Sequence, residues 1–282
     1  MSILEAVVLG IIQGLTEFLP ISSTGHLTVA GKLMGVISSR RPEEWTAFMA
    51  VIQLGTMLAV IIYFRNDLIQ IINDFLKYNV KERVKYSEQS LNSRLGWLII
   101  VGSIPVGVLG LSLKKIIEGT LTKDLYVIAG SLIILAVILA IAEKTASFKK
   151  EIKDIKLWDA FIVGIAQSLA LIPGSSRSGT TITGGLFLGM NRETAARFSF
   201  LFSVPAVLAS GLLELYESLK FLNASMTINL VVSSAAALVF GYISIDFLLR
   251  YLRKYSTFVF IYYRIALGII ILILLYAHVL TP

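Results

Sequence analysis

The sequence lacks cysteine altogether, has only two histidines among its 282 residues, and carries charge on only 15% of them. The absence of cysteine excludes disulfide bonds and thiol chemistry. Soluble domains usually carry about 25% charged residues. The shortage of charge, together with 56% hydrophobic residues and a mean hydropathy of +0.81, favours an all-α integral membrane protein over a large soluble helical core.

The charged residues give the chain a net charge of +7. The basic residues fall in the segments between apolar runs rather than in a continuous basic stripe. Such clusters are typical of loops that face anionic lipid on the cytoplasmic side of a membrane. We therefore expect membrane lipids as partners and no nucleic acid.

Long apolar runs predict six full transmembrane helices. A helix needs about 20 apolar residues to cross a bilayer, and six runs approach that length: 46–64, 95–113, 124–143, 198–215, 227–249 and 258–280. Two further regions, 2–37 and 157–190, are each interrupted by a short polar string that leaves halves too short to cross. These regions are predicted to be re-entrant helix-loop-helix hairpins, whose irregular backbone must be surrounded by protein or by a water-filled cavity.

The two interrupted regions resemble each other. Both contain Gly-x-x-Gln, then a few apolar residues, then Pro-x-Ser-Ser, starting at Gly10 in the first region and at Gly164 in the second. Three crossings follow each hairpin, and because three is odd the second half must enter the membrane upside down relative to the first. This predicts a single transmembrane domain over 1–282, with inverted-topology repeats at about 1–143 and 157–282 and a basic linker at 144–156. In such proteins the site lies at the repeat interface.

The distribution of basic residues predicts the orientation. Most lysines and arginines fall in 65–94, 144–156, 192–197 and 250–254, which the predicted topology places on one side. The loops of the opposite side carry Arg40, Arg41, Lys114, Lys115, Lys123 and Lys220. The richer side should be cytoplasmic, so both termini are predicted to lie outside.

The second polar string has the composition of an anion site. Small residues from Pro173 to Gly179 let backbone N–H groups converge, and the segment that follows can begin a helix. Arg177 adds a fork of N–H donors suited to phosphate. The hydroxyl donors of the string are Ser175, Ser176, Ser178 and Thr181. A Walker-type phosphate loop is excluded because no Gly-Lys-Ser/Thr follows. The alternative is a serine-rich helix break in which Arg177 pairs with Glu17 for structural reasons.

The first polar string adds acid–base groups. Gln13 and Glu17 are four residues apart and therefore share one face of a helix, and His26 follows across a loop. The hydroxyls of that loop belong to Ser22, Ser23 and Thr24. A histidine can act as nucleophile, acid or base near neutral pH, and a carboxylate can hold it in one tautomer or help bind a divalent cation. The alternative is a His26 that is only hydrogen-bonded within a polar loop, but the paired arginine-bearing string favours a functional one.

The strings QGLTEFLPISSTGH (13–26) and PGSSRSGT (173–180) resemble the two signatures of the undecaprenyl-diphosphate phosphatase family, also called the bacitracin-resistance family. Further similar segments are Val51-Ile-Gln53-Leu-Gly55, Trp158-Asp159, Asn191-Arg192-Glu193 and Tyr263-Arg264. The resemblance runs nearly end to end, and the two strings together are highly specific. One departure is Gln13, where the family often has a glutamate. The departure weighs against two-carboxylate metal schemes and leaves Glu17 as the preferred acid or base.

The resemblance implies a multi-pass enzyme of the plasma membrane. Such an enzyme removes the terminal phosphate of undecaprenyl diphosphate, a polyprenyl diphosphate, and yields the monophosphate carrier used for cell-surface glycan synthesis. The resemblance also implies a site that opens outward and stimulation by a divalent cation, Mg²⁺ or Ca²⁺.

Phosphoryl transfer depends on positioning and charge neutralisation more than on covalent chemistry. We therefore assign Arg177 and the backbone after Gly174 to the diphosphate. The other predicted substrate-binding residues are Gln13, Ser22, Thr24, Gln53, Ser175, Ser176, Ser178 and Thr181. Glu17 is predicted to orient or deprotonate and is the candidate metal ligand. His26 is predicted as nucleophile or proton shuttle, Ser23 is the rival nucleophile, and direct attack by an activated water fits equally.

Two other classes fit parts of the sequence. A polyprenyl-phosphate flippase or transporter without hydrolysis is favoured by the inverted repeat alone, but it does not need Glu17, His26 and Arg177 together. A non-catalytic membrane scaffold needs none of them. Phosphate release from a polyprenyl diphosphate discriminates between these classes and an enzyme. A homodimer is also compatible with the sequence.

Overall fold

The computed structural model describes residues 1–37, 42–113, 124–219 and 224–281. Over these residues the chain is helical and has no strand, apart from an isolated bridge between Lys150 and Met190. The α-helices are α1 (Ile3–Glu17), α2 (Ser23–Leu33), α3 (Pro42–Tyr63), α4 (Arg65–Leu76), α5 (Leu91–Ser112), α7 (Leu125–Thr145), α8 (Leu157–Ser168), α9 (Arg177–Phe187), α10 (Arg192–Ser218), α11 (Ala224–Leu252) and α12 (Phe258–Tyr276). The short helices are η1 (Lys77–Lys81), η2 (Tyr86–Glu88), η4 (Ile152–Asp154) and η5 (Leu169–Leu171).

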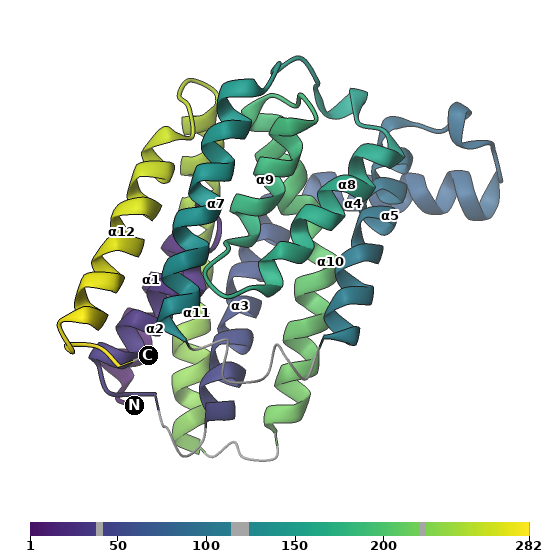
Figure 1. Ribbon diagram of the computed structural model, residues 1–282. Coiled ribbons are helices and arrows are strands. Elements are labelled where there is room, and N and C mark those ends of the chain that lie inside the picture. The colour runs from purple at the N-terminus through teal and green to yellow at the C-terminus, as the bar shows by residue number, and fades with distance from the viewer. Residues whose placement is uncertain (38–41, 114–123, 220–223, 282) are drawn as a thin grey trace.

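Six of the described helices, α3, α5, α7, α10, α11 and α12, are long and apolar enough to cross a membrane, which confirms the six predicted runs. They stand side by side in Figure 1. Several helix ends differ from the predicted ones by three to six residues, and two of them have a clear local cause. Helix α10 begins at Arg192 rather than at 198 because the Asn191 side chain caps it by accepting from Thr194 N at 2.8 Å. Helix α12 ends at Tyr276 rather than at 280 because His278 adopts a left-handed φ of 56°.

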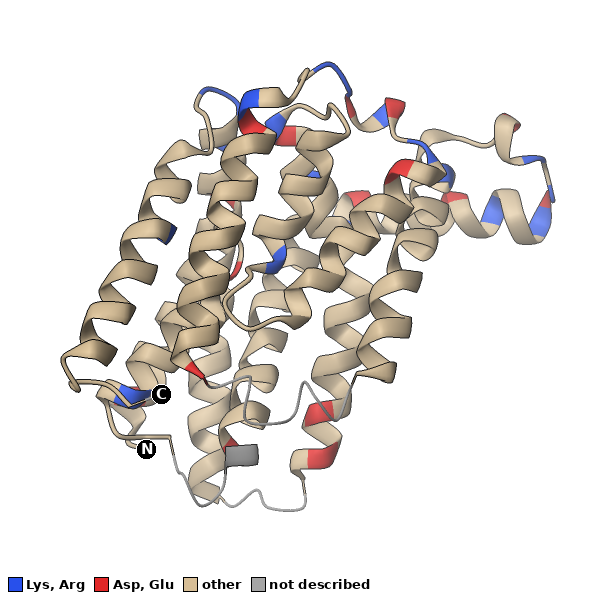
Figure 2. Cartoon of the chain, in the orientation of Figure 1, with Lys and Arg blue, Asp and Glu red and all other residues tan. Residues whose placement is uncertain are grey.

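Charge is distributed unevenly along the bundle. Figure 2 shows lysine and arginine gathered at the end that carries the linker 144–156, whereas both termini lie at the opposite end. Glu143 lies at the basic end and accepts from Arg192 Nε at 2.7 Å and from Thr257 Oγ1 at 2.9 Å. The basic residues predicted for the other side, Arg40, Arg41, Lys114, Lys115, Lys123 and Lys220, lie outside the described residues.

The two Pro-x-Ser-Ser strings form bends of the same local geometry. Ser22 and Ser176 have left-handed φ values of 75° and 66°, and each is the N-cap of the helix that follows, α2 or α9. The Oγ of Ser22 accepts from Gly25 N at 3.2 Å, and that of Ser176 accepts from Gly179 N at 3.1 Å. A side-chain acceptor at this position satisfies a backbone donor that has no partner within the helix. The bends therefore place two helix N-termini inside the bundle.

Close helix packing holds the short helices in the bundle. Helix α1 packs on α11, and α8 packs on α5. A Cβ at Gly10 would collide with the backbone of Ser233, and a Cβ at Gly164 would collide with the backbone of Gly102. Small residues at such contacts let helix backbones approach closely, which is how helices associate in lipid.

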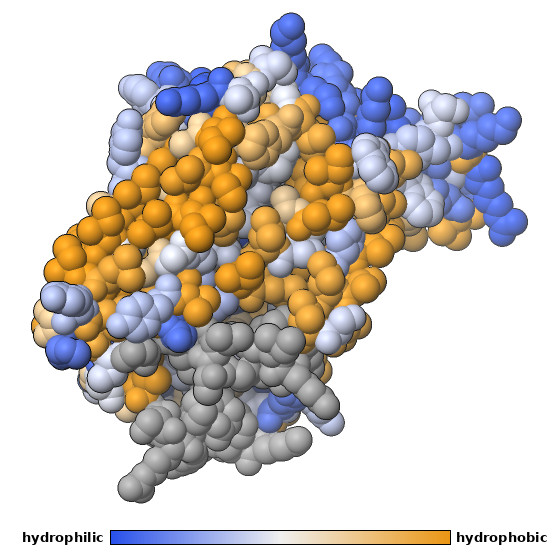
Figure 3. All heavy atoms as spheres, viewed as in Figure 1, coloured by the Kyte–Doolittle hydropathy of each residue, from blue (hydrophilic) through white to orange (hydrophobic). Residues whose placement is uncertain are grey.

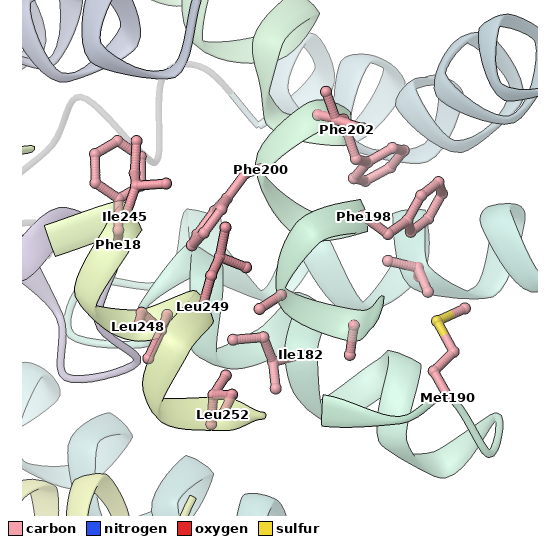
Figure 4. Close-up of a cluster of buried hydrophobic side chains, with 14 of the residues drawn as sticks. Phe18, Ile182, Met190, Phe198, Phe200, Phe202, Ile245, Leu248, Leu249 and Leu252 are labelled. Atoms are coloured by element: carbon pink, nitrogen blue, oxygen red, sulfur yellow. The ribbon is translucent and has the colours of Figure 1, made fainter. Parts of the chain in front are cut away.

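An aromatic cluster anchors the first bend. Phe18 follows the last residue of α1 and is 1% exposed, and its ring meets that of Phe200 edge-on with the centroids 5.3 Å apart. Figure 4 shows Phe18 and Phe200 among the aliphatic side chains of α11, including Ile245 and Leu249. Since Phe18 adjoins Glu17, this packing restrains the end of α1 that carries the carboxylate.

Candidate active site

The two bends meet at an ion pair in the interior of the bundle. The Glu17 Oε1 atom accepts from Arg177 Nη2 at 2.7 Å, across 160 positions of sequence. Beside this pair, Ser178 Oγ donates to the Leu19 carbonyl at 3.1 Å. The carboxylate of the first string and the guanidinium of the second therefore belong to one site.

Glu17 is the centre of a hydrogen-bond network. Its side chain is buried, and both oxygens are engaged. Besides the bond from Arg177, Oε2 accepts from Gln13 Nε2 at 3.0 Å and from Ser23 Oγ at 2.5 Å. A buried carboxylate costs free energy unless it is paired and hydrogen-bonded, and here three donors meet that requirement. The short bond from Ser23 is the geometry expected of a hydroxyl beside its general base.

Ser23 and Arg177 occupy equivalent positions in their helices. Each is the first residue after the capping serine, Ser23 in α2 and Arg177 in α9. Both side chains bond to Glu17, so the N-termini of the two helices converge on the same region. A helix N-terminus carries partial positive charge and free N–H groups, which favours an anion nearby.

Several buried polar atoms of the site have no hydrogen-bond partner among the described residues. They are Arg177 Nη1, Ser175 Oγ, Gln13 Oε1 and both polar atoms of the Gln167 amide. Buried polar atoms are nearly always paired, and an unpaired one calls for a water, an ion or a ligand. Arg177 thus donates to Glu17 through Nη2, while its Nη1 is available to a further acceptor.

A cavity of about 580 Å³ opens beside the ion pair. The predicted site residues that line it are Glu17, Ser22, Ser23, Thr24, Gln53, Gly174, Ser175, Ser176 and Arg177. Its other walls are largely apolar and come from α5, α10 and the segment 170–172, including Val106, Leu111, Ile172, Val207 and Leu213. The cavity therefore has a polar end at the bends and an apolar remainder, which suits a molecule with an anionic head and a hydrocarbon tail.

Three predicted substrate-binding residues support the site without lining the cavity. Gln13 bonds to Glu17 through Nε2. Ser178 bonds to the Leu19 carbonyl and the Ser176 hydroxyl. Thr181 Oγ1 bonds to the Arg177 carbonyl at 2.8 Å and to the Ser199 hydroxyl. Their role as substrate-binding residues stays a prediction.

His26 lies on α2 and is not among the cavity-lining residues. Its Nδ1 lies 2.7 Å from the Ser22 carbonyl, and its Nε2 lies 2.7 Å from the Tyr263 hydroxyl. A carbonyl only accepts, so Nδ1 carries a proton, and in the neutral ring Nε2 then accepts from the Tyr263 hydroxyl. The two rings stack with centroids 5.5 Å apart. His26 thus restrains the turn that presents Ser23, and no described hydrogen bond joins it to Glu17 or Arg177.

Arg264 is a site-supporting residue to which the sequence prediction gave no role. It lies within α12, is 0% exposed, and bonds to five carbonyls rather than to a carboxylate. Its partners are Pro20 at 3.4 Å, Ser131 at 3.5 Å, Leu132 at 3.3 Å, Gly174 at 3.4 Å and Ser175 at 2.9 Å. Arg264 therefore ties both bends to α7. The sequence did contain a sign of this role, since Arg264 stands inside the apolar run 258–280. A charged side chain at membrane depth is costly in free energy and usually has a function.

Gln167 was also given no role. It is 1% exposed, lines the cavity and corresponds to Gln13 in the repeated Gly-x-x-Gln string. The repetition was the available signal, because the two strings share few polar residues besides the serines.

A divalent cation would find oxygen donors here but few carboxylates. Among the described residues no group of three or more His, Asp or Glu side chains is arranged to hold a metal. Glu17 and the unpartnered Oε1 of Gln13 are neighbouring oxygen donors. Mg²⁺ is commonly held by one or two carboxylates together with substrate phosphates, and this donor set fits such a partly substrate-held ion.

The fold and the site define a multi-pass helical membrane protein with a buried Glu17–Arg177 ion pair between two short helix pairs. The family model described as "Bacitracin resistance protein BacA" matches residues 6–270, and the chain belongs to this family. An undecaprenyl-diphosphatase of Syntrophobacter fumaroxidans is 56% identical over 278 residues, covering 99% of each chain. The undecaprenyl-diphosphatase of Myxococcus xanthus is 48% identical and covers 100% of this chain and 92% of its own length. That of Chlorobaculum tepidum is 46% identical and covers 100% of both chains.

Proposed function

We propose that this chain hydrolyses undecaprenyl diphosphate to undecaprenyl phosphate and inorganic phosphate in the cell membrane. The relatives reported above are undecaprenyl-diphosphatases, and they match this chain over nearly its whole length. The observation that carries the proposal to particular residues is the Glu17–Arg177 pair at the polar end of a cavity with apolar walls. The monophosphate is then available again as a carrier for cell-surface glycan synthesis.

The terminal phosphate is proposed to bind at the N-terminus of α9. Arg177 Nη1 and Ser175 Oγ supply donors that have no other described partner. Charge develops on the phosphoryl oxygens in the transition state, and preorganised donors aimed at that charge typically contribute a factor of about 10²–10³. Ser176 and the backbone after Gly174 complete the cradle.

Ser23 is proposed as the nucleophile and Glu17 as its base. Attack of Ser23 Oγ on the terminal phosphorus forms a P–O bond, breaks the phosphoanhydride bond and releases undecaprenyl phosphate, while the hydroxyl proton passes to Glu17. Water then hydrolyses the phosphoserine to inorganic phosphate and restores the hydroxyl. The 2.5 Å bond to Glu17 and the cavity position favour Ser23 over His26, whose two ring nitrogens face Ser22 and Tyr263.

Glu17 is proposed as the residue that would hold a divalent cation, Mg²⁺ or Ca²⁺. When bound, the cation would neutralise charge on the phosphates. Gln13 would add its amide oxygen, which supports an ion held by one protein carboxylate and by the substrate.

The two halves are proposed to be inverted repeats whose short helix pairs are re-entrant. The matching caps of Ser22 and Ser176 support this, as do the matching close approaches of Gly10 and Gly164 to other helices. The packing of α1 on α11 mirrors that of α8 on α5. The basic end is proposed to be cytoplasmic and the termini outside. Cavity residues near the terminal end of the bundle, such as Thr46 and Leu213, support an outward opening.

The proposed function is tested by phosphate release from undecaprenyl diphosphate by the purified protein in detergent. Stoichiometric release of inorganic phosphate and undecaprenyl phosphate is expected. The alternative, lipid movement without hydrolysis, predicts that labelled lipid crosses the bilayer of a proteoliposome while no phosphate appears. That result would overturn the proposal.

A further inference from the structure

A helical arm projects sideways from the basic end of the bundle. It comprises residues 65–90, that is α4, η1 and η2, and it connects α3 to α5. Figure 1 shows its helix lying across the direction of the six long helices and reaching beyond them. The catalytic site described above does not use this arm, so its shape needs another explanation.

One face of the arm is fixed to the bundle. Phe75 lies against Trp97 of α5 with the ring centroids 5.2 Å apart. Asn79 accepts from Trp97 Nε1 at 2.9 Å and donates to Ser93 Oγ at 3.1 Å. Asp67 pairs with Arg197 of α10. Because these contacts reach both α5 and α10, the arm has a defined orientation relative to the bundle.

A second face is apolar and exposed. Ile69, Ile72, Leu76 and Val80 are 56%, 56%, 48% and 58% exposed. Their spacing of three and four residues places them in one stripe along the helix. The stripe is turned about 100° from the face that contains Leu68, Ile71 and Phe75, because each residue of an α-helix rotates by about that angle. It is therefore free of the contacts that fix the arm.

The third face is polar and basic. On it lie Asn66, Gln70, Lys77 and Lys81, and Asn73 lies at its border with the apolar stripe. The turn after the helix adds Arg83 and Lys85. Lys77 is paired only loosely with Glu82, at 3.7 Å with both side chains about half exposed. A helix with an apolar stripe beside a lysine-bearing polar face is typical of the membrane interface.

The surface of the bundle indicates what covers the stripe. Figure 3 shows a broad apolar band over the long helices and hydrophilic atoms at the basic end. The arm leaves the bundle where these zones meet, with apolar atoms on its side toward the band and hydrophilic atoms on its other sides. Exposed apolar residues of α5, including Ile100, Ile104 and Val108, continue the band beneath it. The apolar side of the arm therefore faces the same zone as the apolar surface of the bundle.

We propose that the arm is an interfacial membrane anchor. Its stripe is buried among the acyl chains of the leaflet at the basic end, and its polar face lies at the phospholipid headgroups. Lys77 and Lys81 extend their alkyl stems along the apolar stripe and place their ammonium groups at the phosphates. The occupant of the stripe is thus the bilayer itself and not a partner protein.

The absence of cysteine makes a direct test clean, because a single introduced cysteine is the only labelling site. Ile72→Cys and Gln70→Cys place a nitroxide on two exposed residues that lie about 160° apart around the helix, the first in the apolar stripe and the second on the polar face. The proteins are reconstituted in phosphatidylcholine vesicles containing phosphatidylglycerol. The spin relaxation of the nitroxide is measured with oxygen, which partitions into lipid, and with a nickel chelate, which stays in water. The ratio of the two effects reports whether the label lies in lipid or in water. Ile104→Cys is the lipid reference and Ser87→Cys the aqueous one.

We expect the label at position 72 to match the lipid reference and the label at position 70 to match the aqueous one. High nickel accessibility at both positions would show that the arm stands in water and would overturn the proposal. Low accessibility to both reagents at position 72 would show that protein covers the stripe, which would also overturn it. The measurement does not depend on catalysis, so its outcome is independent of the proposed phosphatase activity.

Discussion

At the scale of single residues, the site is defined by the hydrogen bonds that the Glu17 carboxylate accepts. Donors from Gln13, Ser23 and Arg177 all converge on one carboxylate. The Nη1 atom of Arg177 has no hydrogen-bond partner among the described residues. A purely structural ion pair would leave Arg177 Nη1 and the Ser175 hydroxyl without a role. Phosphate binding gives both groups an acceptor.

The first prediction concerns the two terminal guanidinium nitrogens of Arg177, Nη1 and Nη2. Arg177→Lys keeps the charge, but a single ammonium cannot hold Glu17 and a phosphate in the same fixed geometry. We expect turnover to fall by about a hundredfold or more, equivalent to about 3 kcal/mol of transition-state stabilisation. The measurement is phosphate release at saturating substrate, with thermal unfolding in detergent as the control for folding. Turnover close to that of the wild type would show that Arg177 does not grip phosphate through its fork.

The second prediction separates Ser23 from His26 as the nucleophile. Acid quenching during turnover of substrate labelled in the terminal phosphate should trap label on Ser23. Phosphoserine survives acid, whereas phosphohistidine is lost in acid and survives base. Ser23→Ala should abolish the trapped label, and Tyr263→Phe, which alters only the Nε2 partner of His26, should leave it. Acid-labile label, or label that persists in Ser23→Ala, would contradict the assignment.

At the scale of elements, the short helix pairs depend on glycine contacts that bring helix backbones together. Gly164 of α8 meets the Gly102 backbone of α5, and Gly10 of α1 meets the Ser233 backbone of α11. In lipid such packing replaces the hydrophobic effect as the force between helices. These contacts set the position of α1, which carries Glu17, and of α8, which precedes the second bend.

The third prediction tests this packing. Gly164→Ala should force α8 away from α5, because the added Cβ meets backbone atoms that cannot rotate aside. Overpacking of this kind typically costs about 1–3 kcal/mol, so the midpoint of thermal unfolding in detergent should fall by several degrees. The matched control is Gly130→Ala in α7, where nothing lies within 4 Å of the new Cβ. Equal stability of the two variants would show that the close approach is not required.

The sequence predicted these elements to different degrees. The six crossings follow from apolar length alone, and the bends follow from Pro-x-Ser-Ser inside apolar runs. The meeting of the two polar strings was predicted from their repetition, since the site of an inverted-repeat protein lies at the repeat interface. The pairing of His26 with Tyr263 and the bonds of Arg264 to both bends could not be predicted, since they depend on where α12 packs. The arm was not predicted either, because 65–90 is too polar to span a membrane.

At the scale of the whole molecule, charge and apolar surface together predict how the protein sits in a bilayer. The basic end carries the linker 144–156 and the arm 65–90, while both termini lie at the other end. Basic loops are retained on the cytoplasmic side. The substrate would then enter the cavity from the outer leaflet.

The fourth prediction tests this orientation. In intact cells, Thr281→Cys should react with an impermeant thiol reagent, and Ser87→Cys should react only after the membrane is permeabilised. Both positions are exposed, and the chain has no other cysteine to react. Labelling of Ser87→Cys from outside would reverse the orientation.

The most direct test of the central claim is phosphate release from undecaprenyl diphosphate by purified Glu17→Gln beside the wild type. The amide keeps the shape of the side chain but removes the base beside Ser23 and the charge that positions Arg177. With thermal stability shown to be retained, turnover should fall by at least about a hundredfold, or about 3 kcal/mol. Turnover within about threefold of the wild type, a difference below about 0.7 kcal/mol, would contradict catalysis at the Glu17–Arg177 site.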